Sequence, residues 1–176
     1  GKIIAHLCQG LDMKVIAYDS FLTREQMATL NVIKYDDKME ALQAADVVFV
    51  QMPLIEGITN NTIAKEELKM MKSTAILINT SRGEIINEPD LVEALRSGSI
   101  AGAGLDVFWN EPTNVSDEIL NCPNVIVSPH SAAQTREAVI KMHTDCVEGC
   151  LAVLRGEKWP YVADKAVYNH PCWQKK

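Results

Sequence analysis

Residues 1–19 read GKIIAHLCQGLDMKVIAYD, and the order of features in this stretch indicates the fold. A glycine precedes an amphipathic segment, and an apolar run over Val15–Tyr18 is closed by Asp19. In dinucleotide-binding folds, the third glycine of a GxGxxG turn begins a helix, and an acidic residue roughly twenty positions later takes the ribose hydroxyls. The spacing fits if Gly1 is that third glycine. The alternative is that Asp19 caps a turn and Gly1 is an arbitrary start, and these residues alone leave both open.

Strands and helices alternate along the rest of the chain. This alternation predicts an α/β fold with a parallel sheet covered by helices on both faces. The tail after Gly156 has no helical period, so we expect a domain over residues 1–156 and an extended arm over residues 157–176. We expect strands at 14–18, 31–34, 47–50, 75–78, 102–107 and 125–127, and helices at 23–30, 39–45, 65–71, 87–97 and 134–154.

Composition excludes several classes of protein. The formal net charge of −6 argues against nucleic acid as a partner, because phosphate binding needs a basic surface. No apolar run reaches the roughly 18 residues of a membrane span. The five cysteines form no CxxC motif, which is typical of reduced thiols in a cytoplasmic protein. Cys146 and Cys150 are four residues apart, but two thiols alone make a poor metal site, so we expect no metal.

Chemically competent side chains follow three of the predicted strands. Arg82 comes after the strand at 75–78, Glu111 lies beyond the strand at 102–107, and His130 comes after the strand at 125–127. Ligands of open α/β sheets gather at the carboxyl ends of the strands. An arginine there can clamp a carboxylate with two hydrogen bonds, and a histidine beside a carboxylate can transfer a proton. Each residue alone is more often structural, but together they favour an active site.

Six motifs, taken in order, resemble the D-isomer-specific 2-hydroxyacid dehydrogenases, which include phosphoglycerate, D-lactate, glyoxylate and hydroxypyruvate enzymes. The resemblance covers about Gly1 to Gly156, and the order of the motifs is more specific than any one of them. They are GKIIA at 1–5, VIAYD at 15–19, MPL at 52–54, NTSRGE at 79–84, GAGLDVFWNEP at 102–112 and SPHSAA at 128–133.

The resemblance implies a Rossmann-like, doubly wound parallel sheet and NAD-dependent interconversion of a D-2-hydroxy acid and its 2-keto acid. By motif, Arg82 would hold the substrate carboxylate, His130 would be the general acid/base, and Glu111 would hydrogen-bond to His130 and favour its protonated form. An acid at position 19 repels a 2′-phosphate, so NAD is expected over NADP. The cofactor-binding residues implied are Gly1, Asp19, Met52, Pro53, Thr80, Ser81, Asp106 and Ser131.

Two departures from the family pattern qualify the resemblance. Gln51 occupies a place where the family often has histidine, and it would alter contacts near the cofactor. Trp109 and Asn110 fall where the family varies, so they do not identify the hydroxy acid. Glutamate at position 111 argues against the related formate dehydrogenases, which carry glutamine in that role.

In the family, the first strand, the first two glycines and most of a substrate domain lie upstream of the position of Gly1. We therefore expect a carboxyl-terminal part of a longer enzyme, with little activity alone, whose sheet lacks its central strand. The arm at 157–176 would return to the substrate domain. A homodimer through the cofactor domain is expected. The alternative function is a non-catalytic, NAD-sensing, corepressor-like module on the same fold.

Overall fold

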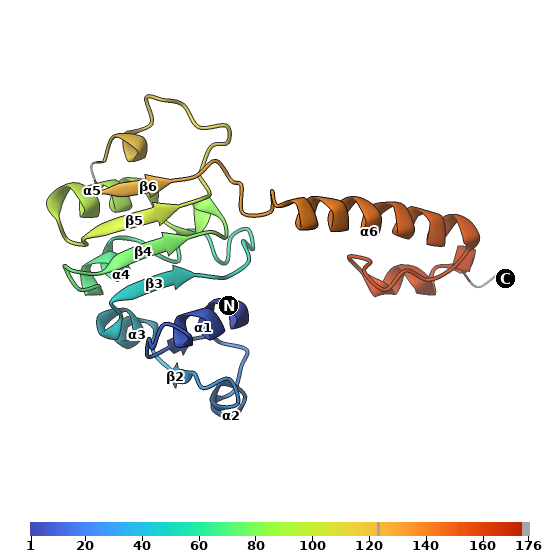
Figure 1. Cartoon of the computed structure of the whole chain (residues 1–176), viewed down its shortest axis with the longest axis horizontal. Coiled ribbons are helices and arrows are strands. Elements are labelled where there is room, and N and C mark those ends of the chain that lie inside the picture. Colours follow the sequence, from blue (N-terminus) through green and yellow to red (C-terminus); the bar gives the residue numbers. More distant parts are fainter. Residues whose placement is uncertain (123, 174–176) are drawn as a thin grey trace. The chain divides into compact units, whose positions relative to one another are not determined.

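A computed structural model describes residues 1–122 and 124–173 (Figure 1). It divides the chain into two compact units, residues 1–130 and residues 131–176. The predicted boundary between residues 1–156 and 157–176 concerns the domains of a whole enzyme and stays a prediction.

The first unit contains all the strands among the described residues, and they form two parallel sheets. One sheet pairs β1 (Ile16–Tyr18) with β2 (Ile33–Tyr35). The other has the order β3-β4-β5-β6 and comprises β3 (Val47–Val50), β4 (Ile76–Asn79), β5 (Gly102–Leu105) and β6 (Val125–Val127). Helices connect the strands: α1 (Lys2–Gln9), α2 (Arg24–Ala28), α3 (Lys38–Ala44), α4 (Lys65–Met70) and α5 (Glu88–Ser97). Short 3₁₀ turns are η1 (Gly83–Ile85) and η2 (Glu118–Asn121).

The α/β class and the parallel strands are confirmed, but a single continuous sheet is not present in the described residues. Among the described residues, no strand pairs with both β1 and β3 to join the two sheets. Helix α3 instead contacts β1, β2 and α4. In a doubly wound sheet of order 3-2-1-4-5-6, the first strand occupies the corresponding place, between the second and fourth strands.

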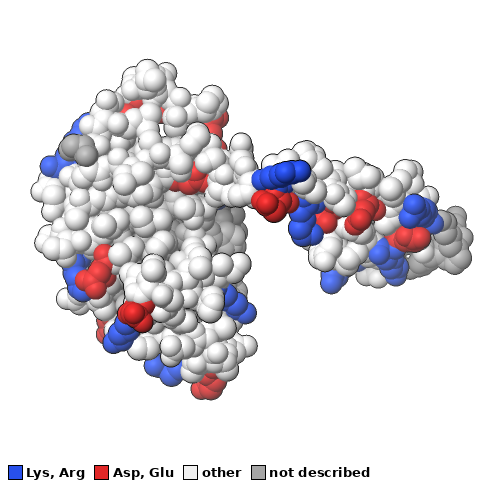
Figure 2. Space-filling model, viewed as in Figure 1, with Lys and Arg blue, Asp and Glu red and all other residues white. Residues whose placement is uncertain are grey.

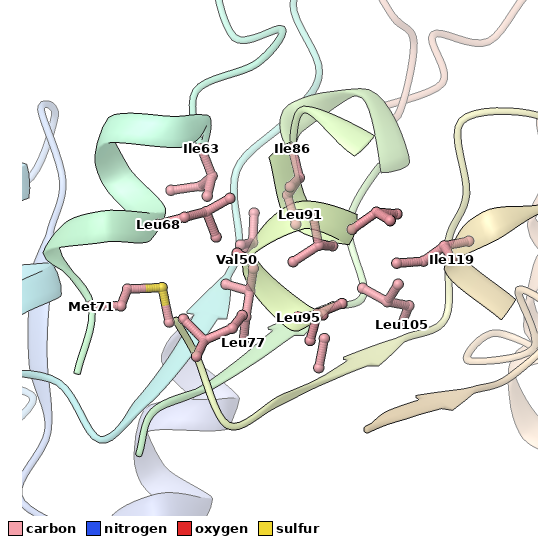
Figure 3. Close-up of a cluster of buried hydrophobic side chains, with 14 of the residues drawn as sticks. Val50, Ile63, Leu68, Met71, Leu77, Ile86, Leu91, Leu95, Leu105 and Ile119 are labelled. Carbon is pink, nitrogen blue, oxygen red and sulfur yellow. The ribbon is translucent and has the colours of Figure 1, made fainter. Parts of the chain in front are cut away.

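One face of the larger sheet carries the hydrophobic core. Side chains of Val50, Leu77 and Leu105 point toward α4 and α5, where Leu68 and Leu91 meet them (Figure 3). The opposite face of this sheet is formed by the alternate residues of the same strands. Its row Phe49↔Ile78↔Gly104↔Ile126 alternates with the core row. Its exposed members include Phe49, at 38% of its surface, and Ile126, at 81%.

Local sequence signals account for the helix ends. Thr23 and Gln26 form a reciprocal capping box at the start of α2, and the Asn87 side chain accepts a hydrogen bond from the Asp90 N–H at the start of α5. Gly98 ends α5 with φ 71°, a left-handed conformation that favours glycine. The predicted limits of this helix are thereby confirmed.

The second unit consists of α6 (Arg136–Arg155) and the tail. Thr135 caps the start of α6, and Gly156 ends it with φ 73°. On the face shown in Figure 2, acidic and basic residues of this unit are interspersed, and Lys141 and Asp145 pair at 2.8 Å.

The described part of the tail is not extended throughout. The tail forms 3₁₀ turns η3 (Lys165–Asn169) and η4 (Pro171–Trp173). The Tyr168 hydroxyl donates to the Trp159 carbonyl at 2.8 Å and accepts from the Trp159 N–H at 2.7 Å. Trp159 also packs beside Gly149 of α6. These aromatic contacts fold the tail onto α6, and residues 174–176 lie outside the described residues.

Within the described residues, no helix is both long enough and apolar enough to cross a membrane.

Candidate active site

A histidine–carboxylate pair lies beyond the carboxyl ends of β5 and β6. His130 Nδ1 and Glu111 Oε2 are 2.7 Å apart, and the other carboxylate oxygen of Glu111 accepts the Phe108 N–H at 2.9 Å. His130 has φ 49°, a left-handed conformation that is unusual away from glycine, so its backbone is held by its surroundings. The two side chains remain 44% and 37% exposed, which leaves the pair open to a ligand.

The electrostatics of this pair keep Glu111 ionised. The hydrogen bond with His130 lowers the pKa of the Glu111 carboxyl from its ordinary value, and the hydrogen bond from the Phe108 N–H lowers it further. Burial opposes these effects weakly, and the charges of His130 and Arg82 add to them. Glu111 is therefore a standing negative charge that orients the imidazole through Nδ1 and leaves Nε2 for another partner.

Arg82 is positioned by the turn that follows β4. The buried Asn79 side chain donates to the Arg82 carbonyl at 2.8 Å and accepts the Ser81 N–H at 3.0 Å. The Ser81 hydroxyl donates to the same Asn79 oxygen at 2.9 Å. With its backbone held in this way, the exposed Arg82 side chain donates to the Ser81 carbonyl at 2.6 Å.

The turn is pressed against the segment that carries Glu111. A Cβ on Gly83 would lie 2.2 Å from the carbonyl carbon of Phe108, so this approach of two backbones requires glycine. The contact explains how the motif at 79–84 and the motif at 102–112 are brought together. It also places the Arg82 charge near Glu111, as the lowered pKa of that carboxyl reflects.

Asp106 is buried at the end of β5, with 5% of its surface exposed. The Ser128 hydroxyl donates to its Oδ1 at 2.5 Å. This bond joins the segment after β6 to the segment after β5. Ser128 and Asp106 precede His130 and Glu111, respectively, in these two segments.

The remaining predicted cofactor residues lie at strand ends or at the start of α1. Asp19 accepts the N–H groups of Phe21 and Leu22 at 2.7 and 3.0 Å through one oxygen, Oδ1, so the turn-capping interpretation holds locally. Thr80 bonds to the Gln51 side chain at 3.0 Å. Gly1 is the N-cap of α1, whose first turn has no side-chain cap and no acidic residue. Met52 and Pro53 follow β3, and Ser131 begins the second unit.

A family model for the D-isomer specific 2-hydroxyacid dehydrogenase NAD binding domain matches residues 1–132. The chain belongs to this family. The resemblance inferred from the six motifs is thus confirmed, as is NAD as the cofactor of the domain.

Similar proteins include a glyoxylate reductase, a D-3-phosphoglycerate dehydrogenase and a D-lactate dehydrogenase. A glyoxylate reductase of Korarchaeum cryptofilum is 37% identical over 167 residues, which are 95% of this chain and 50% of that protein. A D-3-phosphoglycerate dehydrogenase of Archaeoglobus fulgidus is 35% identical over 156 residues, 89% of this chain and 29% of that protein. The structure of D-lactate dehydrogenase with NAD⁺ from Lactobacillus jensenii superposes with a TM-score of 0.82 at 32% identity, covering 94% of this chain and 52% of that one. The chain spans about half the length of the relatives it matches most extensively.

Three positioning groups of this NAD-binding domain escaped the sequence analysis. Asn79 organises the turn before Arg82, Ser128 bonds to Asp106, and the Phe108 N–H holds Glu111. The asparagine and the serine belong to quoted motifs, but their partners lie in the turn or on a neighbouring strand. A backbone N–H carries no residue-specific signal, so only the structure reveals the third.

Proposed function

We propose that these 176 residues are the cofactor-binding and proton-transferring part of an oxidoreductase that interconverts a D-2-hydroxy acid and its 2-keto acid with NAD. The observation that carries this proposal is the His130–Glu111 pair at 2.7 Å, next to Arg82 at the carboxyl edge of a parallel sheet in an NAD-binding domain. Together they supply one cation for a carboxylate and one group for proton transfer.

The three side chains divide the work by their chemistry. The Arg82 guanidinium would hold the substrate carboxylate with two parallel hydrogen bonds, for which its planar geometry is suited. His130 would give a proton to the keto oxygen in reduction and take it back in oxidation. Glu111, ionised because its pKa is lowered, would hold the imidazole by Nδ1. NAD, when bound, supplies or accepts the hydride.

The residues present suit NAD. The first turn of α1 presents backbone N–H groups with no competing side-chain cap and no acid, which is what a pyrophosphate needs at a helix N-terminus. Asp19 uses Oδ1 in its turn, and its carboxylate ends β1 where ribose hydroxyls bind in such folds. Buried Asp106 would lie by the nicotinamide amide. Met52, Pro53, Thr80, Ser81 and Ser131 would line the rest of the groove.

Two further parts of the proposal concern the setting of the enzyme. All five cysteines are free thiols, which suits a reducing, cytoplasmic location. A homodimer through the cofactor domain is proposed from the family resemblance, and light scattering on the complete protein tests it.

The test is a panel of 2-keto acids assayed with NADH and with NADPH in the complete protein. We expect reduction of at least one keto acid, with NADH preferred. Arg82→Lys should raise KM and lower kcat while leaving NADH affinity nearly unchanged, because lysine keeps the charge but not the two-pronged geometry. Tight NADH binding without turnover of any 2-keto or D-2-hydroxy acid would contradict the proposal and favour the NAD-sensing module.

A further inference from the structure

A second cavity, of about 780 Å³, opens between α5 and the loop that joins β5 to β6. Its size falls in the range of small-molecule sites. None of Arg82, Glu111 and His130 lines it, so it is separate from the candidate active site. Figure 1 shows this loop, in yellow, beside α5 at the edge of the larger sheet.

Part of the cavity wall is apolar. Val92, Phe108 and Ile119 line it and are buried in the folded unit. The Trp109 ring also lines it, and its indole N–H donates to the Ile86 carbonyl at 2.5 Å. A ring held in this way offers a preformed surface for an alkyl chain or for a cation over its face.

The charge of the cavity is negative and only partly compensated. Four acidic residues and one arginine line it. Glu118 pairs with Arg96 at 2.6 Å, and Glu93 pairs with Lys65 at 3.0 Å. Among the described residues, no cation pairs with Glu88 or with Asp117.

The excess of negative charge in the cavity affects the protonation of Glu88. Burial raises the pKa of the Glu88 carboxyl, and the charges of Asp117 and Glu118 raise it further. Two carboxylates that repel each other next to an aromatic wall are electrostatically complementary to a positive group with an apolar body.

We propose that this cavity binds a small organic cation, namely a primary amine or guanidinium carried on an alkyl chain. The positive group would lie between Glu88 and Asp117, and the chain would pack on Trp109 and Val92.

The wall of the cavity also leads to the catalytic pair. Phe108 lines the cavity, and its N–H bonds to Glu111 at 2.9 Å. The backbone of Phe108 also approaches the turn that carries Arg82, because a Cβ on Gly83 would lie 2.4 Å from the Phe108 carbonyl oxygen. If a ligand shifted Phe108 or Trp109, the displacement would therefore reach Glu111 and His130.

Agmatine, which carries an amine and a guanidinium on a butyl chain, is the probe. Isothermal titration calorimetry on the 176-residue chain at low salt should give saturable binding with a Kd below about 1 mM. Neutral 1,4-butanediol and anionic glutarate should not bind, and added NaCl should weaken the binding of agmatine.

Variants separate the charges from the fold. Glu88→Gln and Asp117→Asn should each weaken agmatine binding about tenfold, whereas Glu88→Asp, which keeps the charge, should lose less. The control is Glu148→Gln, an exposed carboxylate of the second unit, which should bind like the parent. Three results would overturn the proposed site. They are no binding at about 10 mM agmatine, butanediol binding as tightly as agmatine, and an unchanged agmatine affinity in both Glu88→Gln and Asp117→Asn.

Transmission to the catalytic pair has its own readout. Saturation with agmatine should move the NMR signals of the His130 ring and of the Gly83 amide, neither of which lines the cavity. Binding with both signals unmoved would overturn the connection. Because this readout does not measure turnover, its failure is distinguishable from failure of the proposed dehydrogenase activity.

Discussion

The two sheets of the first unit differ in how much of their own structure supports them. Every residue of the large core cluster lies between Leu42 and Cys122, around β3–β6. In residues 1–35, by contrast, the buried hydrophobic side chains are Met27 and Val32. Helix α1 buries none of its residues, and its Ile3 and Leu7 are 76% and 61% exposed.

This difference separates the two tasks of the candidate site. The proposed proton-transfer and carboxylate-binding residues extend from the well-packed β3–β6 sheet, which supplies most of the buried apolar area and hence most of the stability. The proposed adenosine-binding acid, Asp19, ends β1 of the thinly packed sheet. Changes in the first region should act on chemistry or on folding, and changes in the second on cofactor affinity.

The largest expected effect is on turnover. In the complete protein, His130→Ala should lower kcat for keto-acid reduction by about 10²–10⁴-fold, because the proton donor is lost. NADH affinity, measured by fluorescence titration, should stay close to the parent value. If the variant kept its kcat but lost NADH binding, His130 would belong to the cofactor-binding residues instead.

Stability should divide in the same way. Leu77→Ala in β4 should lower the free energy of unfolding by about 2–5 kcal/mol, because the side chain is fully buried and its loss leaves a cavity. Ile3→Ala in α1 should change it by no more than about 0.5 kcal/mol, as for an exposed site. Urea denaturation of the 176-residue chain measures both, and equal losses would remove the distinction between the two sheets.

Cofactor affinity should depend on Asp19. Asp19→Ser should weaken NADH binding about 10–100-fold through the loss of charged hydrogen bonds to the ribose, and it should narrow the preference over NADPH. Serine can still accept from the Phe21 and Leu22 N–H groups, so the turn is kept. Unchanged cofactor preference would leave Asp19 with its turn-capping role alone.

The pH dependence of turnover, which we expect the His130–Glu111 pair to set, should change by a smaller amount. The Glu111→Gln variant has no carboxylate that ionises beside the imidazole, so the change in keto-acid reduction that follows ionisation of Glu111 on the acid side of the pH profile should be lost. The pKa of Glu111 is lowered in the folded state, so its contribution to stability is present above its ordinary pKa and is lost as pH falls through the folded value. The pH profile of kcat/KM for the parent and the variant measures this effect. Identical profiles would show that Glu111 and His130 do not act together.

The smallest effect should come from Glu88, an uncompensated charge in the otherwise well-packed region. Its pKa is raised in the folded state, so stability is greatest when it is protonated and falls as pH rises through that value. Glu88→Gln should therefore raise Tm slightly near pH 7 and not at about pH 4, although an acid in the first turn of α5 gains a little from the helix dipole. A lower Tm for the variant near pH 7 would show that the dipole outweighs the repulsion.

The sequence by itself determined the class of fold and the identity of most candidate residues. The short run Val47–Val50, rich in β-branched valine, forms strand β3. Asn87, Pro89 and Gly98 mark the ends of α5 through local hydrogen bonds and φ preferences. The motifs also placed Arg82, Glu111 and His130 at strand ends. The roles given to these residues stay predictions until they are measured.

Only the tertiary structure decided how these pieces meet. The break between β1 and β3, the order of the strands in the larger sheet, and the return of the tail onto α6 depend on pairings between residues distant in the chain. The 2.7 Å contact of His130 with Glu111 and the approach of Gly83 to Phe108 are of the same kind. Periodicity and turn preferences act within a few residues. The contacts named here form only when the assembled sheet brings distant segments together, which closes the long loops between them. No local pattern carries that information.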